Sequence, residues 1–332
     1  MPRKNNNITA SIDNCKNKVL EGRPLSFKEA ETLFSCGEES IYHLFNSAYE
    51  IRKCFLGKKV ELCAITNARS GACPEDCAFC AQSSWHRTGI KAYPLLSMDE
   101  IYLRAKRAEE IGAGYFCIVT SGRNIRPGRD FKKICKAIEK IRTQLKIKVD
   151  ASLGELTLDK AKALKEAGLL RYNHNLETAR SLYPKVCTTH TYSHRLKTIE
   201  NIRKAGLELC CGGIFGMGET SGQRLELLFA LREFQPKCIP INFLNPIPGT
   251  KLAAKKPLSP LDFLKIVSIC RFLFPRQEIK ICGGREANLR SLQPFLFLAG
   301  ANSIIIGDYL TTKGNSPQYD LQMIRDLGLR AN

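Results

Sequence analysis

The sequence predicts an α/β fold: a (β/α)8 TIM-type barrel with an N-terminal helical extension. Its 332 residues exceed one average domain but suit a barrel of about 250 residues with extensions. From about residue 60 onward, short runs rich in β-branched residues alternate with longer segments of helical period, as expected for βα units of a parallel sheet. Eight such runs are present. A doubly wound open sheet is the alternative that periodicity leaves open.

The predicted strands and helices divide the chain into three parts. The eight strands are residues 60–66, 115–121, 147–153, 169–173, 208–214, 237–243, 279–283 and 302–306. Between them, Ser97, Thr157 and Ser193 are predicted to begin helices. Residues 26–36 and 40–56 have a helical pattern and are expected to pack outside the barrel. We therefore predict a helical extension (1–57), the barrel (58–320) and a C-terminal tail (321–332).

The composition argues against several classes of protein. Hydrophobic residues make up 44% of the chain, but no run of about 18 apolar residues is available to span a membrane. The first 20 residues are polar and lack a signal core, which predicts a cytoplasmic location. The 15 cysteines lack disulfide-framework spacing and fit a reducing compartment. The net charge of +19 is dispersed on helical faces, so we expect no nucleic-acid partner.

The segment that follows the first predicted strand carries the most specific signal. Residues 71–84 read GACPEDCAFCAQSS, in which Cys73, Cys77 and Cys80 form a C-x3-C-x2-C motif. Structural zinc needs four protein ligands, and no partner pair stands at zinc-finger spacing. Three thiolates suit a [4Fe–4S] cluster and leave its fourth iron open to a substrate. Three ordinary buried cysteines are the plainer alternative, which the polar residues between them disfavour.

This segment resembles the radical S-adenosylmethionine superfamily, and the longer string NARSGACPEDCAFCAQSS is similar to that of the biotin synthase family. The resemblance extends over nearly the whole predicted barrel. Its further stretches are YNHNLET (172–178), CCGGIFGMGET (210–220), PINFL (240–244), GGRE (283–286), GANSI (300–304) and LTT (310–312).

The resemblance implies roles for particular residues. Cys73, Cys77 and Cys80 would hold the [4Fe–4S] cluster, whose open iron chelates S-adenosylmethionine and whose electron cleaves it to methionine and a 5′-deoxyadenosyl radical. Phe79 matches the position beside the adenine, Asn175 and Glu177 match ribose-contacting positions, and Arg195 matches the residue that pairs with the methionine carboxylate. A helix cap at Glu177 and a solvated helix residue at Arg195 are the plainer alternatives.

The implied substrate is dethiobiotin, which carries a ureido ring and an aliphatic carboxylate. Its ring needs amide partners, which Asn173, Asn175 and Asn242 can supply. Thr311 and Thr312 match positions near the carboxylate tail. The resemblance further implies sulfur insertion to give biotin, a reducing electron-donor protein and a homodimer.

The sequence departs from the family at the second, sulfur-donating cluster. That [2Fe–2S] cluster is usually held by three cysteines and an arginine; Cys117 and Cys210 match, but Asp150 and Lys280 replace the other two. Aspartate is a harder ligand than thiolate, and lysine lacks the delocalised guanidinium group.

Cys63 and Cys282 are the cysteines that can compensate. We hypothesise an altered auxiliary cluster, either [2Fe–2S] or a larger sulfide-bearing cluster, bound by Cys63, Cys117, Cys210 and Cys282. The alternative is that Cys63 and Cys282 only pack. The remaining cysteines considered, predicted to be core residues, are Cys54, Cys135, Cys211, Cys238 and Cys270, with Cys211 facing away from Cys210.

Three other functions remain open at this stage. A radical enzyme of the hydrogenase-maturation type shares the C-x3-C-x2-C loop. A non-catalytic iron–sulfur carrier would not need the residues that contact S-adenosylmethionine. A basic RNA-binding protein would retain nucleic acid at low salt and lose it at high salt.

Overall fold

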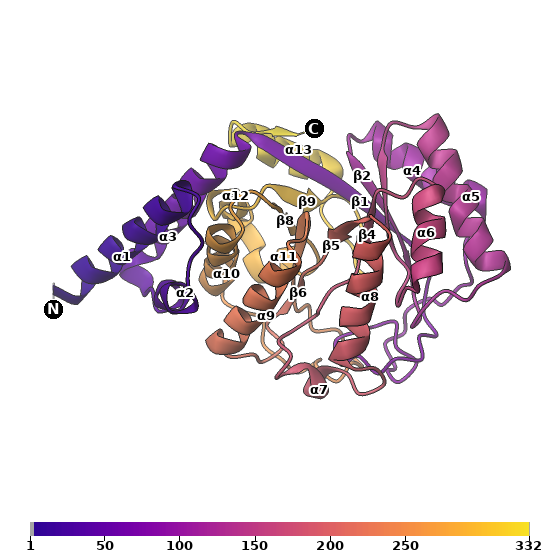
Figure 1. Ribbon diagram of the computed structural model, residues 1–332, viewed down its shortest axis with the longest axis horizontal. Helices are drawn as coiled ribbons and strands as arrows, with labels where there is room; N and C mark the ends of the chain where they lie inside the picture. Colours follow the sequence, from indigo (N-terminus) through magenta and orange to yellow (C-terminus); the bar gives the residue numbers. More distant parts are fainter. Residues whose placement is uncertain (1–2, 332) are drawn as a thin grey trace.

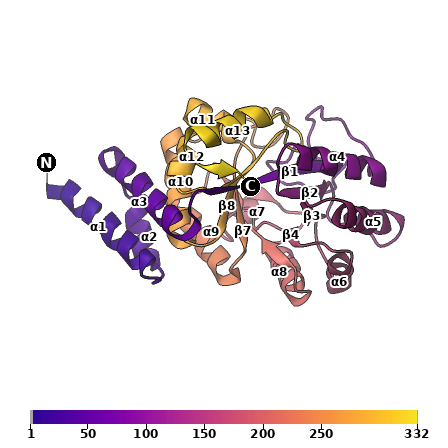
Figure 2. The ribbon, with the colours of Figure 1, turned by 90° about the horizontal axis from the view of Figure 1, so that it is seen from above.

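Eight parallel strand positions close into a barrel in the computed structural model, which describes the backbone of residues 3–331 and the side chains of residues 8–331 (Figures 1 and 2). Neighbouring strands follow the order β1–β2–β3–β4–β5–β7–β8–β9, and β9 pairs with β1 to complete the ring. The barrel prediction is confirmed, and the open-sheet alternative is wrong. The strands are β1 (Lys59–Arg69), β2 (Tyr115–Thr120), β3 (Lys148–Ser152), β4 (Arg171–Asn173), β5 (Glu208–Cys210), β6 (Gly213–Phe215), β7 (Cys238–Phe243), β8 (Glu278–Ile281), β9 (Ser303–Ile305) and β10 (Arg330–Ala331).

Helices surround the strands on the outside (Figure 2). They are α1 (Arg3–Leu20), α2 (Phe27–Phe34), α3 (Glu38–Leu56), α4 (Met98–Glu110), α5 (Arg129–Gln144), α6 (Leu158–Glu166), α7 (Tyr183–Val186), α8 (Tyr192–Lys204), α9 (Ser221–Phe234), α10 (Pro260–Leu273), α11 (Arg285–Leu289), the 3-10 turn η1 (Arg290–Leu292), α12 (Phe295–Leu298) and α13 (Pro317–Asp326). In the part of the chain that is described, no helix has the length and apolar character that a membrane crossing requires.

Each predicted strand is present, but the fifth is divided. Residues 208–214 form β5 and β6, which both pair with β7 and are separated at Gly212. A Cβ atom at Gly212 would lie 1.9 Å from the carbonyl oxygen of Pro240. Only glycine therefore allows the backbone between β5 and β6 to approach β7 this closely.

The N-terminal helices pack beside α10 and α9 at one end of the molecule (Figure 1). Capping residues begin α2 at Ser26 and α4 at Ser97, each with a complete capping box. No helix is predicted before residue 20, yet α1 occupies this segment and buries Ile12, Cys15 and Val19. These three residues, with Ile8 and Leu20 partly buried beside them, form a narrow apolar stripe on a mostly polar helix. Such a stripe is too weak to detect without knowing its partner, α3.

One predicted helix start is wrong by two residues. Thr191, not Ser193, caps α8, because its hydroxyl accepts the backbone N–H of His194. The cap at Thr157 is confirmed for α6.

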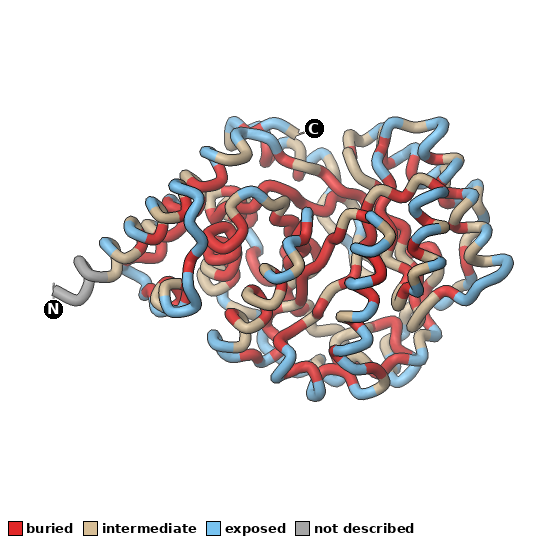
Figure 3. The backbone as a smooth tube through the Cα atoms, in the orientation of Figure 1, coloured by how far each residue is buried: buried red, intermediate tan, exposed pale blue. Residues whose placement is uncertain are grey.

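The strands of the barrel are mostly buried (Figure 3). The buried residues are not all apolar. Alternate residues of each strand point inward, so the register fixes which side chains share the interior. Among the inward residues are the buried charged groups Asp150, Arg171 and Lys280. Buried charged groups need partners of opposite charge or hydrogen bonds. The partners of these three groups are described with the candidate site below.

Candidate active site in the barrel

The loop after β1 carries the three motif cysteines over one mouth of the barrel. Cys73, Cys77 and Cys80 are each partly exposed. Backbone amides of Glu75 and Gly122 hydrogen-bond to Cys73, and those of Gln82 and Ser83 hydrogen-bond to Cys80. Iron–sulfur clusters are bound by cysteine sulfurs that accept hydrogen bonds from backbone amides. The loop supplies both, so it fits such a cluster.

A cavity beside this loop brings together the residues predicted to contact S-adenosylmethionine. It lies where loops follow the carboxyl ends of the strands, which is where barrel enzymes place their chemistry. Its lining includes Cys73, Cys77, Cys80, Phe79, Asn175, Glu177 and Arg195. Three separate segments of the chain therefore meet around one space.

Arg195 is fixed from several sides. Its Nη1 donates to the carbonyl oxygen of Asn175 at 3.0 Å and lies 3.3 Å from a Glu177 carboxylate oxygen. Its Nε donates to the Tyr183 hydroxyl at 2.6 Å. The side chain is buried, so the alternative of a solvated helix residue is wrong. A guanidinium group held in this way is ready to receive a carboxylate.

Glu177 adopts an unusual backbone conformation, with φ at 69°. Its carbonyl oxygen accepts the N–H of Ile214 at 2.7 Å, and a Cβ atom on Gly213 would approach that same oxygen to 2.7 Å. The following helix, α7, begins after Leu182 without a side-chain cap, so the helix-cap alternative for Glu177 is wrong. The contacts around this residue hold its strained backbone, and in this conformation the Glu177 side chain lines the cavity.

A second cavity of about 300 Å³ extends from the first toward the barrel centre. Phe79, Asn173 and Asn175 line both cavities. Other residues that line the second cavity are Asn242, Thr311, Thr312, Cys117, Lys280 and Cys282. All the residues predicted to bind substrate therefore face one space that opens toward the first cavity.

Three cysteines, from β1, from β2 and from the position directly after β8, gather at this cavity. Cys63, Cys117 and Cys282 share one buried cluster with Ile305. The amide of Asn173 donates to the Cys117 sulfur at 3.0 Å, and the Lys280 ammonium lies 3.7 Å from the Cys63 sulfur. Burial raises the pKa of Cys63 to about 12. Without a metal these thiols therefore stay protonated, and they would lose their protons when a cluster binds.

Cys238 also faces the barrel interior. Pro240 and Asn242 on the same strand line the second cavity, and the two-residue period places Cys238 on that face. It is the register partner of Cys210 and hydrogen-bonds to it. The prediction that Cys238 is buried is confirmed, but it lies among the interior thiols rather than in the outer core.

The other cysteines divide between the core and the surface. Cys211 and Cys270 are buried in the outer core, as predicted. Cys135 is half-buried against the same core. Cys54 is exposed, so its prediction as a core residue is wrong. It lies in the last turn of α3 at the edge of the buried face, and cysteine's usual burial does not reveal which part of a helix it occupies.

Asp150, which replaces one of the cluster cysteines expected from the resemblance, is engaged in an ion pair. The guanidinium of Arg171 lies 3.1 Å from its carboxylate and donates to Glu278 at 2.7 Å. Arg171 and Asp150 are essentially inaccessible to solvent. The charge of Asp150 is therefore balanced by Arg171. The neighbouring thiols remain as the soft ligands that a cluster could use.

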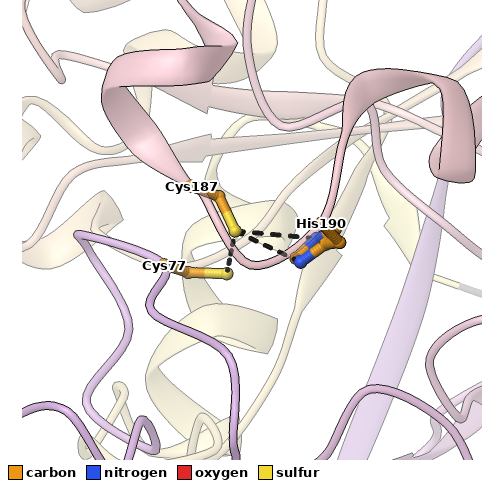
Figure 4. Close-up of side chains that lie close together, drawn as sticks. All are labelled: Cys77, Cys187 and His190. Atoms are coloured by element: carbon orange, nitrogen blue, oxygen red, sulfur yellow. Dashed lines mark hydrogen bonds between the residues drawn. The ribbon is translucent and has the colours of Figure 1, made fainter.

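Sequence reasoning missed a group of residues beside the motif loop. Cys187 lies 3.7 Å from Cys77, sulfur to sulfur, and 3.2 Å from Nδ1 of His190 (Figure 4). The hydrogen bond from Cys77, followed by that from His190, lowers the pKa of Cys187 to about 4 despite burial. The spacing Cys187–x2–His190 was the available signal, but its partner Cys77 lies 110 positions away.

Comparisons with known proteins agree with this arrangement. A Radical SAM superfamily domain matches residues 68–231, and a Biotin and Thiamin Synthesis associated domain matches residues 240–330. The biotin synthase of Trichlorobacter lovleyi is 47% identical over 318 residues, covering 96% of this chain and 96% of that protein. The chain belongs to the biotin synthase family. Its chemistry within this family is that of a radical S-adenosylmethionine enzyme.

Solved structures match this biotin synthase family member in fold. Methylornithine synthase (PylB) superposes with a TM-score of 0.84 at 20% identity, covering 96% of this chain and 97% of that one. HydG, a maturase of the [FeFe]-hydrogenase, gives a TM-score of 0.83 at 18% identity, covering 98% of this chain and 76% of that one. Identities this low report the shared barrel alone.

Proposed function

We propose that this protein inserts sulfur into dethiobiotin to form biotin, using S-adenosylmethionine and two iron–sulfur clusters. One observation carries the proposal: the cavity beside the motif cysteines and the cavity above the interior cysteines share Phe79, Asn173 and Asn175. A substrate in the second cavity would therefore lie between the site where the radical forms and a source of sulfur. When bound, the first cluster supplies the electron that cleaves S-adenosylmethionine.

The chain's own residues would position the reactants. Arg195 would take the methionine carboxylate, Asn175 and Glu177 the ribose hydroxyls, and Phe79 the adenine. Asn173 and Asn242 would bind the ureido ring, and Thr311 and Thr312 the carboxylate tail. Each of these side chains lines one of the two cavities, which supports the assignment.

Biotin formation is the direct test of this function. Anaerobically reconstituted, reduced protein is expected to convert dethiobiotin to biotin and to release methionine and 5′-deoxyadenosine. Cleavage of S-adenosylmethionine without any biotin would favour another radical reaction. Absence of both products, together with retained iron, would favour a non-catalytic carrier.

We propose that the auxiliary cluster is held by Cys63, Cys117, Cys210 and Cys282, with Cys238 as a fifth available thiol. A larger sulfide-bearing cluster is favoured over [2Fe–2S], because five buried thiols surround Lys280 while Asp150 is paired with Arg171. Soft thiolates are the preferred ligands of such clusters.

Serine at Cys63 or Cys282 is expected to reduce the iron and sulfide content beyond that of the first cluster. The loss should reach the whole auxiliary cluster if four thiols are required, and Mössbauer spectroscopy would resolve the two clusters. Cys211→Ser is the matched control, since Cys211 neighbours Cys210 but packs in the outer core. Unchanged iron and sulfide in both variants would assign Cys63 and Cys282 to packing alone.

We further propose that an acidic redox protein delivers the electrons at a basic groove beside the cluster loop. The groove is lined by Arg69, Arg123, Arg126 and Arg129 together with the loop residues Gly71, Ala72 and Pro74. Arg126 and Arg129 are exposed. Opposite charges steer such encounters and accelerate them most at low salt.

Charge reversal at Arg126 and Arg129 tests the groove. We expect the double variant to raise the KM for an acidic flavodoxin or ferredoxin donor roughly 10-fold at low salt. Reduction by dithionite should keep the wild-type rate, because a small reductant needs no docking. The double variant Lys28→Glu/Lys53→Glu, an equal charge change at exposed positions of the N-terminal helices α2 and α3, is the control. An equal rise in KM in that control would attribute the effect to net charge.

We also propose a cytoplasmic homodimer. All 15 cysteines are free, which supports a reducing location. Cell fractionation and sedimentation of the purified protein test the location and the dimer.

A further inference from the structure

We propose that, when its first cluster is absent, the protein binds one soft divalent metal ion of the zinc class through Cys77, Cys187 and His190. The three residues come from the motif loop and from the segment between α7 and α8 (Figure 4). The inference rests on the proposed function only in assigning Cys77 to the first cluster as well.

The spacing of the ligand atoms is close to that of tetrahedral coordination. The two sulfur atoms lie 3.7 Å apart, and the Cys187 sulfur lies 3.2 Å and 3.9 Å from the two ring nitrogens of His190. Two sulfurs at 2.3 Å from a tetrahedral zinc ion are separated by roughly 3.7 Å, and a sulfur and a nitrogen by roughly 3.6 Å. One ligand atom from each residue lies within 4.8 Å of the others.

His190 is oriented as a metal ligand. Glu75 lies 2.5 Å from its Nδ1 and would hold the proton on that nitrogen when an ion binds, which would leave Nε2 as the ligand atom. A carboxylate that holds one ring nitrogen while the other binds metal is the usual second layer of zinc sites. Arg195 now donates to Nε2 at 3.1 Å and would give up this one contact while keeping its bonds to Tyr183 and Asn175.

The site differs from the cluster site in every ligand except Cys77. Cys73 and Cys80 belong only to the cluster, whereas Cys187 and His190 belong only to the ion. Because Cys77 serves both, the ion and the cluster exclude each other. Zinc bound here would tie the motif loop to the segment between α7 and α8, and it would have to leave before the cluster is built.

Cobalt titration of the reduced, cluster-free protein tests the site. We expect one equivalent of Co²⁺ to bind with sulfur-to-cobalt charge-transfer absorption and tetrahedral d–d bands, and Zn²⁺ to displace it. Cys187→Ser and His190→Ala should each weaken binding roughly 10- to 100-fold or more. Cys73→Ser and Cys80→Ser, which remove cluster ligands, should leave it intact. Circular dichroism would verify that each variant is folded.

Competition with assembly is the second measurement. Zn²⁺ is expected to block iron loading of the wild-type motif loop but not that of Cys187→Ser. Cobalt binding that persists in both Cys187→Ser and His190→Ala, or that disappears equally in Cys73→Ser, would overturn the proposal. Since the readout is metal binding to cluster-free protein, a failure to form biotin would leave this result unaffected.

Discussion

Alanine in place of Cys80 is expected to abolish cleavage of S-adenosylmethionine. Cys80 is one of three thiols in the loop, and its sulfur receives backbone amides from Gln82 and Ser83 that hold it toward the cavity. Without the Cys80 thiolate, a second iron of the cluster would have no protein ligand, in addition to the iron that is open to S-adenosylmethionine. Formation of methionine and 5′-deoxyadenosine should fall on the order of 10³-fold or more, the scale seen when an essential catalytic group is lost.

The measurement combines product analysis with iron content after anaerobic reconstitution. Cys270→Ala serves as the control, because Cys270 is fully buried in the outer core. It should lose stability but keep its iron and its cleavage activity. Wild-type cleavage by Cys80→Ala would contradict the assignment of the motif loop to the first cluster.

Methionine at Arg171 is expected to destabilise the fold strongly. Arg171 is the buried cation between Asp150 and Glu278, at 3.1 Å and 2.7 Å. Without it, two carboxylates remain in the barrel interior, and among the described residues Lys280 is the other cation acting on both of them. Breaking a buried pair on one side costs roughly 3–5 kcal/mol in the free energy of unfolding.

Urea unfolding of the cluster-free variant and wild type measures this difference. Lys204→Met is the matched control, because Lys204 pairs with Glu200 on the exposed face of α8. That control should change the free energy of unfolding by less than about 1 kcal/mol. A similarly small change for Arg171→Met would mean that the interior carboxylates are protonated and do not need the cation.

The fold and the first cluster loop could be predicted because their signals are local. Each strand is a short apolar run, and Cys73, Cys77 and Cys80 lie within eight residues of one another. The carboxyl ends of parallel strands meet at one mouth of the barrel, so Asn173 and Asn242 could be expected at the same cavity. These predictions need the strand order but no knowledge of side-chain packing.

Helix α1 and the break at Gly212 could not be predicted in the same way. The apolar stripe of α1 becomes meaningful only against α3. Gly212 is required by the approach of Pro240, a residue on the neighbouring strand. In both places the deciding neighbour is remote in sequence.

The sequence by itself determined the barrel, the family and the cysteine motif, because strand period, ligand spacing and residue type are properties of short segments. Only the tertiary structure decided that Cys187 and His190 stand beside Cys77, that Cys238 joins Cys210, and that Arg171 neutralises Asp150. Those contacts depend on the register between strands and on the course of loops between them. A shift of one residue would turn each inward side chain to the opposite face.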